Sequence, residues 1–383
     1  MKKILYIGCS DPRTTKSGGA QRSNFIWRAL KSLGEVYTVV SCFPGQEMKA
    51  NDDKEKIRFV RIYQPGRLKR VIGGIAGKLK IGQLFDCPFG YASQAIGWQE
   101  VEFDFVVVRY AWWAAAWSAW NFAPMYIDVD DVPMVEFDSL LQQRLPRWMR
   151  PICRFFFKHW QAKVLSRAKG LWVPNKDDVR LIDCYAPTKH LRNLAKSAPD
   201  EYAVVGKQRK ILLTVGFMGH TPNAEGVSWF VREVWPKVYA EHPDWIFAVA
   251  GGGAAETDKQ AWAAVSGVRV LGFVDDLNAE YEKAAAVVAP ILSGAGTCIK
   301  VMESCLRGRK TFVTHCACRG YENESSLQLQ EFSDADDFVK ELDAWIAQDD
   351  QVKEGTQRAI QAAAEKINSF EDFAAVIREA LMI

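Results

Sequence analysis

The pattern of apolar and polar residues in the second half of the chain predicts strands that alternate with helices. Apolar runs of strand length fall at 210–215, 245–250, 268–271, 286–290 and 311–314, with segments of helical character between them. This alternation favours a parallel sheet with helices on both faces. After residue 336 the pattern predicts helices only, and the last helix, 370–382, follows a possible N-cap at Ser369.

The first half of the chain predicts a similar arrangement. Apolar runs of parallel-sheet character fall at 3–9, 36–40, 105–108, 125–129 and 171–173, and residues 20–33 have helical spacing. A chain of 383 residues is too long for one ordinary core. We therefore expect an α/β protein with one domain over 1–190, a second over 200–369, and a loop-like boundary near 187–200.

Composition excludes several classes of protein. The net charge of +3 is too small to indicate nucleic-acid binding, and no motif for it is present, so we expect no nucleic-acid partner. No apolar run has the length of a membrane-spanning helix, and the first residues do not resemble a signal peptide. Nine scattered cysteines are typical of a reducing cytoplasm. Because Cys316 and Cys318 are one residue too close for a Cys-x-x-Cys corner, we expect no metal there.

Two basic segments of the first half contain embedded apolar residues. The segment 144–169 reads as a long helix broken near Pro151, and 67–81 has the same mixture of residues. Such segments suit an anionic membrane surface, so we consider peripheral contact with the inner face of the membrane. The alternative is an ordinary helix with a charged outer face.

The segment from Ser293 to Glu303 is the most informative part of the sequence. Small residues, SGAGT, lie between a predicted buried strand and a predicted helix, so backbone N–H groups are free to face an anion such as phosphate. Lys300 and Glu303 are three residues apart on one face of that helix. A cation for a diphosphate and a carboxylate for a ribose diol would suit a nucleotide sugar. The alternative is a helix start with a surface Lys and Glu.

Four motifs, in order, resemble the sugar-donor domain of the GT-B glycosyltransferases, most closely the retaining family 4. They are KILLTVGFMG at 210–219, Thr221-Pro222-Asn223 with the helix that follows, VRVLGFVDD at 268–276, and the segment ending at Glu303. The resemblance covers residues 205–345 well and the first half more loosely. It implies two Rossmann-like domains that face a cleft, with the C-terminal helix, 370–383, packing back on the first domain.

The resemblance also implies roles for residues of the second half. Lys300 would be the cation for the leaving diphosphate, and Glu303 would hold the ribose hydroxyls. Further contacts to the sugar donor would come from Gly219, His220, Phe273, Val274, Gly294, Gly296 and Thr297. This chain departs from the family twice, because Ala295 replaces a carboxylate and Cys298 stands where a related subgroup has arginine. Arg22 or Lys176 are candidates to replace that arginine.

Two sites of the first half match positions that line the family's cleft. Gly18 and Gly19 lie between the first strand and the first helix, where glycine lets the backbone approach a sugar or phosphate closely. Asp130 and Asp131 end a strand, and either could orient or deprotonate an acceptor hydroxyl. Taken alone, the two glycines are an ordinary turn, and the aspartates are a polar strand end that caps a loop.

The resemblance therefore implies a metal-independent, retaining hexosyltransferase without a cofactor. Its sugar donor would be a nucleoside-diphosphate sugar, UDP- or GDP-linked, and its acceptor a glycan or a lipid-linked sugar. Two alternatives remain open. One is a sugar-nucleotide epimerase on the same fold, and the other is a non-catalytic binding or scaffolding protein.

Overall fold

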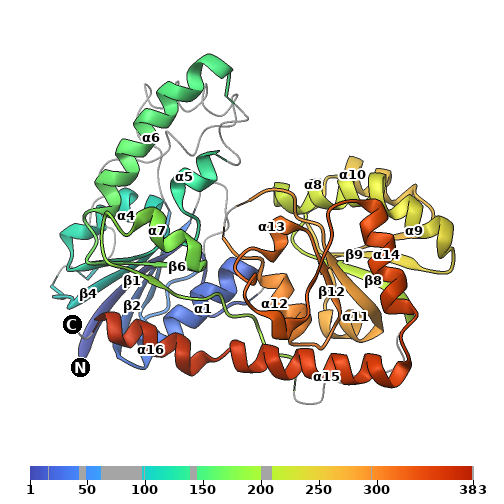
Figure 1. Cartoon of the computed structure of the whole chain (residues 1–383). Coiled ribbons are helices and arrows are strands. Elements are labelled where there is room, and N and C mark those ends of the chain that lie inside the picture. Colours follow the sequence, from blue (N-terminus) through green and yellow to red (C-terminus); the bar gives the residue numbers. More distant parts are fainter. Residues whose placement is uncertain are drawn as a thin grey trace. The chain divides into compact units, whose positions relative to one another are not determined.

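The computed structural model describes residues 1–15, 17–42, 49–61, 97–98, 100–138, 145–199, 209–294 and 296–381. The chain divides into two compact units, Met1–Asn193 with Phe370–Ile383, and Leu194–Ser369 (Figure 1). The division falls inside the stretch 187–200. The basic segment 67–81, Arg144 and Ala295 lie outside the described residues.

The sheet of the first unit is parallel throughout its described strands. Its strand order is β3 (Ile57–Arg61), β2 (Gly34–Cys42), β1 (Lys2–Gly8), β4 (Phe105–Arg109), β5 (Met125–Asp128), β6 (Gly170–Val173) and β7 (Thr188–His190). The central strands are buried on both faces, which explains why they appear in the sequence as nearly continuous apolar runs.

Helices cover both faces of this first sheet. On one face lie α1 (Gly18–Lys31) and α16 (Phe370–Leu381), and on the other lie α4 (Ala111–Ala116), α6 (Arg150–Leu165) and α7 (Val179–Ile182) (Figure 1). The helix α5 (Pro133–Glu136) follows β5 and packs against α6. Short turns of 3₁₀ helix occur at η2 (Ala119–Asn121), η5 (Arg147–Met149) and η6 (Lys176–Asp178).

The second unit repeats this architecture with a second parallel sheet. Its strand order is β10 (Val268–Gly272), β9 (Ile246–Ala250), β8 (Arg209–Val215), β11 (Ala284–Ala289), β12 (Thr311–Val313) and β13 (Gln330–Glu331). The predicted α/β class with two such layers is confirmed.

Helices of the second unit also lie on both faces of their sheet. One face carries α8 (Thr221–Trp229), a π-helical turn (Phe230–Val234), α9 (Trp235–Glu241), α10 (Glu256–Ala263) and α14 (Ala335–Ile346). The other carries α11 (Leu277–Lys283), α12 (Ile299–Cys305), α13 (His315–Cys318), η8 (Ser325–Leu327) and α15 (Asp350–Ile367).

The C-terminal helix α16 completes the first unit, as expected. Its Phe370 and Phe373 rings lie 6.2 and 6.3 Å from the ring of Phe25 on α1, and the Arg28 guanidinium lies 4.5 Å from the centre of Phe370. Ile377 and Leu381 are buried on the same helix. After α15, the last helix of the second unit, the chain continues into α16, which belongs to the core of the first unit.

The expected break near Pro151 lies between η5, which ends at Met149, and α6, so no single α-helix runs through 147–165. Pro151 stands in the first turn of α6, which then continues unbroken to Leu165. A proline is tolerated there because the N–H that it lacks has no partner within the helix at that position. The helix therefore begins at Arg150, one residue before this proline and directly after the separate turn η5.

Gly226 is required where α8 crosses the end of β11. A Cβ atom at this position would overlap the backbone carbonyl oxygen of Pro290, which cannot move aside as a side chain would. We expect Gly226→Ala to lower the free energy of unfolding of the second unit by about 1–3 kcal/mol or more.

Urea unfolding would measure this loss. Gly355→Ala is the matched control, because Gly355 lies in α15 and a Cβ there meets no other atom within 4 Å. That change should raise stability by about 0.5–1 kcal/mol through helix propensity. Equal effects of the two substitutions would contradict the close approach of α8 to Pro290.

Candidate functional site

In the second unit, Lys300 joins three segments at the carboxyl ends of the strands. Its Nζ donates a hydrogen bond of 2.7 Å to Asn223 Oδ1 in the first turn of α8. Asn223 Nδ2 in turn donates to the Phe217 carbonyl at 2.8 Å, in the turn that follows β8. A Cβ atom on Gly216 would lie 2.8 Å from Lys300 Nζ, so glycine leaves the space that this ammonium occupies.

The surroundings of Lys300 lower the pKa of its ammonium group. Burial lowers the pKa of Lys300, and the nearby Cys298 and Glu303 oppose that shift only in part. Burial also lowers the pKa of His220, and the Lys300 charge lowers it further. The site thus combines one partly desolvated ammonium with an imidazole that favours its neutral form, an arrangement that would gain from an incoming anion.

Two glycines in the loop between β11 and α12 keep the backbone accessible. Gly294 has φ = 136° and Gly296 has φ = 76°, a region that other residues adopt only with strain. A Cβ on Gly294 would meet no atom within 4 Å, so this bend is not packed shut. Thr297 follows, and its methyl group packs against Gly320. The loop therefore presents open backbone shortly before α12, the helix that begins at Ile299 and carries Lys300 in its first turn.

Two exposed phenylalanines flank the glycine turn 251–253 after β9. The side chain of Phe217 is 61% exposed and its ring covers Gly219 and Gly253, where a Cβ would overlap it. Phe273 is 70% exposed, and its Cβ lies 3.6 Å from the position that a Cβ on Gly252 would occupy. Apolar rings held in water at strand ends are suited to stack on a flat ligand.

The other predicted contacts for the sugar donor also lie in the second unit. Glu303 is partly buried on α12, one helical turn from Lys300, and its carbonyl accepts a 2.9 Å hydrogen bond from Arg307 Nη1. Val274 is partly buried against the core beside β8, whereas its neighbour Phe273 faces solvent. The structure therefore brings Lys300, His220 and Glu303 together.

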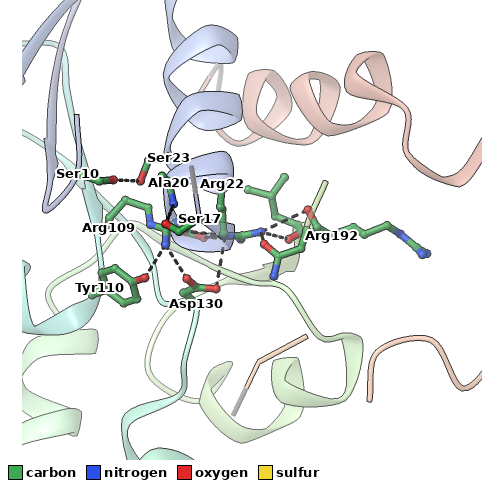
Figure 2. Close-up of polar contacts among 12 residues, drawn as sticks. Ser10, Ser17, Ala20, Arg22, Ser23, Arg109, Tyr110, Asp130 and Arg192 are labelled. Carbon is green, nitrogen blue, oxygen red and sulfur yellow. Dashed lines mark hydrogen bonds and ion pairs between the residues drawn. The ribbon is translucent and has the colours of Figure 1, made fainter. Parts of the chain in front are cut away.

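In the first unit, two arginines and two aspartates form a buried cluster at the ends of β4 and β5 (Figure 2). Arg22 on α1 donates from Nε to Asp128 Oδ2 at 2.9 Å, and Arg109 Nη2 lies 2.5 Å from Asp130 Oδ2. Arg109 also donates to the Tyr110 hydroxyl at 2.8 Å. Asp130 is the member closest to solvent, with 14% of its side chain exposed.

The backbone at this cluster is strained. Tyr110 has φ = 67° and Asp130 has φ = 52°, values that non-glycine residues seldom adopt. Burial disfavours the charge on Arg109, but Tyr110, Asp130 and Asp128 together hold its pKa above the usual value. Burial raises the pKa of Tyr110. The strained backbone and the ion pairs together fix the side chains of Tyr110, which follows β4, and Asp130, which follows the neighbouring strand β5.

The predicted glycines of the first loop lie beside this cluster. Gly18 opens α1 behind the N-cap Ser17, and a Cβ on Gly19 would lie 3.4 Å from the Tyr110 hydroxyl. Asp131 is partly buried and directly follows Asp130. The sequence-predicted residues thus fall into two groups, one on each unit.

Arg22 does not replace the arginine that Cys298 displaces. Its side chain is fully buried, and its Nη1 donates to the Leu191 carbonyl at 2.9 Å and to Asn193 Oδ1 at 2.8 Å. With its remaining nitrogens bound to Asp128, Arg22 is a structural cation of the first unit. Lys176 in η6 is exposed and stays a candidate.

Sequence reasoning missed Arg109 and Phe217. Arg109 was detectable as a charged residue that ends the buried run FVVVR, because a charge in a strand that is otherwise buried needs a partner. Phe217 was hidden inside an apolar motif. Among the described residues, the group with ligand types and spacing for a metal is Glu241, His242 and Asp343, which includes no predicted site residue.

Comparison with protein families matches part of the second unit. The model of the family "Glycosyl transferases group 1" matches residues 209–348, which carry the β8 turn, α8, α12 and the loop before it. A curated relative, the "Uncharacterized 44.6 kDa protein in cps region" of Klebsiella pneumoniae, is 23% identical over 221 residues. That alignment covers 56% of this chain and 53% of the relative, so the chain spans about half the length of the curated relative that it matches.

Solved structures similar to this chain include several that share nearly its full length. Sucrose-phosphate synthase from Thermosynechococcus elongatus has a TM-score of 0.67 at 13% identity, with 99% of this chain and 98% of that chain covered. Anabaena HepE in complex with UDP and glucose has a TM-score of 0.63 at 12% identity, with full coverage of both. WaaG, a glycosyltransferase involved in lipopolysaccharide biosynthesis, has a TM-score of 0.60 at 11% identity, with 94% and 95% covered.

Asp128 compensates two buried guanidinium groups, so its loss should destabilise the first unit strongly. We expect Asp128→Asn to lower the free energy of unfolding of this unit by about 3–5 kcal/mol, because it leaves Arg22 and Arg109 underneutralised. Glu55→Gln is the control, since it breaks an exposed 2.7 Å pair with Lys31 and should cost about 1 kcal/mol at most. Similar urea midpoints for the two variants would refute the structural role of the cluster.

Proposed function

Because residues 209–348 form a glycosyl transferases group 1 domain in a chain with the GT-B fold, we propose that this protein transfers a hexose. The sugar donor is a nucleoside-diphosphate sugar, UDP- or GDP-linked, and the acceptor is a glycan or a lipid-linked sugar. The observation that carries the proposal is Lys300, an ammonium with a lowered pKa that sits between the β8 turn and an open glycine loop.

Lys300 is suited to the charge that sugar transfer creates. The bond from the anomeric carbon to the diphosphate breaks, the diphosphate leaves with the electron pair, and the acceptor oxygen forms the new bond. A fixed cation stabilises that leaving group without having to reorganise. Asn223 holds the ammonium in place by its 2.7 Å hydrogen bond. We propose that this lysine supplies the positive charge that a divalent ion supplies in other transferases.

We propose that the nucleoside binds along the carboxyl edge of the second sheet. Phe273 and Val274 form the base contact, Glu303 accepts from the ribose hydroxyls, and Gly294, Gly296 and Thr297 offer backbone N–H groups to the phosphates. Gly219 and His220 border the same anion. The 70% exposure of Phe273 supports a stacking role, since a nucleobase would remove that ring from water.

We propose that the acceptor binds at the carboxyl edge of the first sheet, beside Asp130 and Asp131. Arg109 engages Asp130, an arrangement that favours orienting an acceptor hydroxyl over removing its proton and leaves Asp131 as the base candidate. Two buried hydrogen-bond donors at this edge, Arg109 Nη1 and Asn175 Nδ2, have no partner among the described residues. Buried donors without partners are rare in folded proteins, and acceptor hydroxyls would satisfy them.

Retention of anomeric configuration is also part of the proposal and is supported by the resemblance to family 4 alone. We further propose a cytoplasmic location, because an odd number of scattered cysteines is typical of a reducing compartment. The replacement of arginine by Cys298, with Arg22 fully engaged elsewhere, specifically favours one second candidate, a non-catalytic binding protein.

Removal of Lys300 tests the leaving-group assignment. With a panel of UDP- and GDP-sugars, we expect Lys300→Ala to lower kcat/KM for transfer or hydrolysis about 10²–10³-fold while the fold persists. Lys310→Ala is the matched control, because Lys310 also has a pKa lowered by burial but lies at the amino end of β12. Unchanged turnover in Lys300→Ala would remove the assignment. Binding without turnover in the wild type would favour the non-catalytic candidate.

The lowered pKa of Lys300 also predicts how affinity for the sugar donor depends on pH. As pH rises through a lysine pKa below 10.5, the ammonium loses its charge and affinity for the diphosphate falls, earlier than for an ordinary lysine. Lys300→Arg keeps its charge across that range, so its affinity should stay level. Calorimetric titration with UDP from pH 7 to about pH 10 separates the two. Parallel pH profiles would contradict contact between Lys300 and the diphosphate.

A further inference from the structure

The outward side of η5 and α6 in the first unit carries a row of large apolar side chains that face solvent. Trp148 is 71% exposed, Ile152 52%, Phe155 59% and Phe156 67%. Figure 1 shows α6, in green, extending away from the strands of its unit. Single exposed apolar residues are ordinary on protein surfaces, but four within nine positions of sequence form a patch that marks an interaction surface.

The patch is separate from the face by which α6 joins its own unit. Phe157, Gln161 and Val164 are buried and hold the helix to the rest of the first unit. Ile152, Phe155 and His159 recur at a spacing of three and four residues on the opposite side, and the Phe155 ring lies 4.2 Å from the His159 ring. The helix is therefore apolar on two sides, and packing among the described residues of its unit accounts for only one of them.

Basic residues predominate in the sequence that carries this patch. Between Asp138 and Asp177 the sequence contains no acidic residue. The exposed basic side chains along η5, α6 and the turn that follows α6 include Arg147, Arg154, Lys158, Lys163 and Arg167. Of these, Arg154 is paired with Asp138 at 2.7 Å, and Arg167 lies over the Trp120 ring at 4.4 Å. Aromatic side chains surrounded by lysine and arginine are complementary to an anionic lipid surface, where rings enter the headgroup region and cations meet phosphates.

We propose that the outward side of η5 and α6 docks on the surface of a membrane that contains anionic lipids. Among the described residues, no helix combines the length and the apolar character needed to cross a bilayer. The contact would be peripheral, with Trp148, Phe155 and Phe156 at the level of the headgroups and Lys158 and Lys163 facing lipid phosphates.

The buried side of α6 connects this surface to the chain that leaves the Asp130 cluster. Gln161 Oε1 accepts a 2.9 Å hydrogen bond from the backbone N–H of Met134, three residues beyond Asp131. The Phe157 ring stacks at 5.2 Å on Phe137, and Trp160 stacks at 4.1 Å on Trp112. If the proposed function holds, docking through α6 would bring the acceptor side of the first unit to lipid-borne substrates. The docking itself requires no sugar chemistry.

Vesicle co-sedimentation of the full chain tests the proposal. We expect binding to vesicles of phosphatidylcholine with phosphatidylglycerol, and little binding to phosphatidylcholine alone. The double variant Phe155→Ser, Phe156→Ser should lose at least about tenfold in partitioning, since it removes two exposed rings and no core contact. Leu181→Ser is the matched control, because Leu181 is a 45% exposed apolar residue on α7 of the same unit and should not alter binding.

A second pair of variants separates lipid charge from apolar contact. Lys158→Glu with Lys163→Glu should reduce binding about tenfold or more, and added salt should weaken the wild type in the same direction. The proposal is overturned if the wild type ignores anionic vesicles, or if Leu181→Ser loses as much binding as the phenylalanine variant. It is also overturned if the patch drives only self-association. In that case the wild type would form a dimer and bind no vesicles, and the double variant Phe155→Ser, Phe156→Ser would be a monomer.

Thermal unfolding of each variant shows whether it is folded, and affinity for UDP-sugar without vesicles reports on the second unit alone. Vesicle binding with no use of a nucleotide sugar would retain the docking surface and remove the proposed function. Sugar transfer without vesicle binding would support the proposed function and remove the docking surface.

Discussion

Parallel pairing of strands is the constraint on which the candidate site depends. In both sheets every described pair of neighbouring strands runs in the same direction, so the carboxyl ends of the strands come together at one edge of each sheet. Segments far apart in sequence, such as the turn after β8 and the first turn of α12, meet there for that reason. A chain that pairs its strands in parallel must also cover both faces with helices, and this explains why its central strands are nearly continuous apolar runs.

The buried charges of the first unit contribute differently from its apolar core. Placing two guanidinium groups and two carboxylates out of water has a large desolvation cost, which the ion pairs offset only if their geometry is good. The shortest contacts of Arg22 with Asp128 and of Arg109 with Asp130, at 2.5–2.9 Å, meet that condition, whereas Arg109 Nε lies 3.2 Å from Asp128 Oδ2. A hydrophobic cluster of the same size would hold the sheet as well, but it would not fix hydrogen-bonding groups at the ends of β4 and β5. The cluster therefore contributes more to fixing the positions of polar atoms at this edge of the sheet than to the stability of the unit.

The fold was largely predictable because its signal is local and repeated. Apolar runs of strand length identified the central strands of both sheets, and the glycine-rich segment identified the loop before α12. The short edge strands β7 and β13 gave no such signal, because a strand of two or three residues with one neighbour has little apolar surface to bury. The role of Arg22 was misjudged for a physical reason. A basic residue near a glycine loop can serve a ligand or an internal carboxylate, and only the fold brings Asp128, distant in sequence, against it.

The way the last helix is placed determines how this protein can be divided. The Asn368 side chain donates to the Ala195 carbonyl at 2.9 Å and accepts from the Ala195 N–H at 2.8 Å, so the chain leaving the second unit is fastened beside the chain that enters it. After this pair of hydrogen bonds, α16 contributes Phe373, Ile377 and Leu381 to the interior of the first unit. A fragment cut at Asn193 would expose the apolar side of α1 that these residues cover. Recombinant expression of the first unit alone therefore requires a permuted gene that joins the segment from Phe370 onward to Met1.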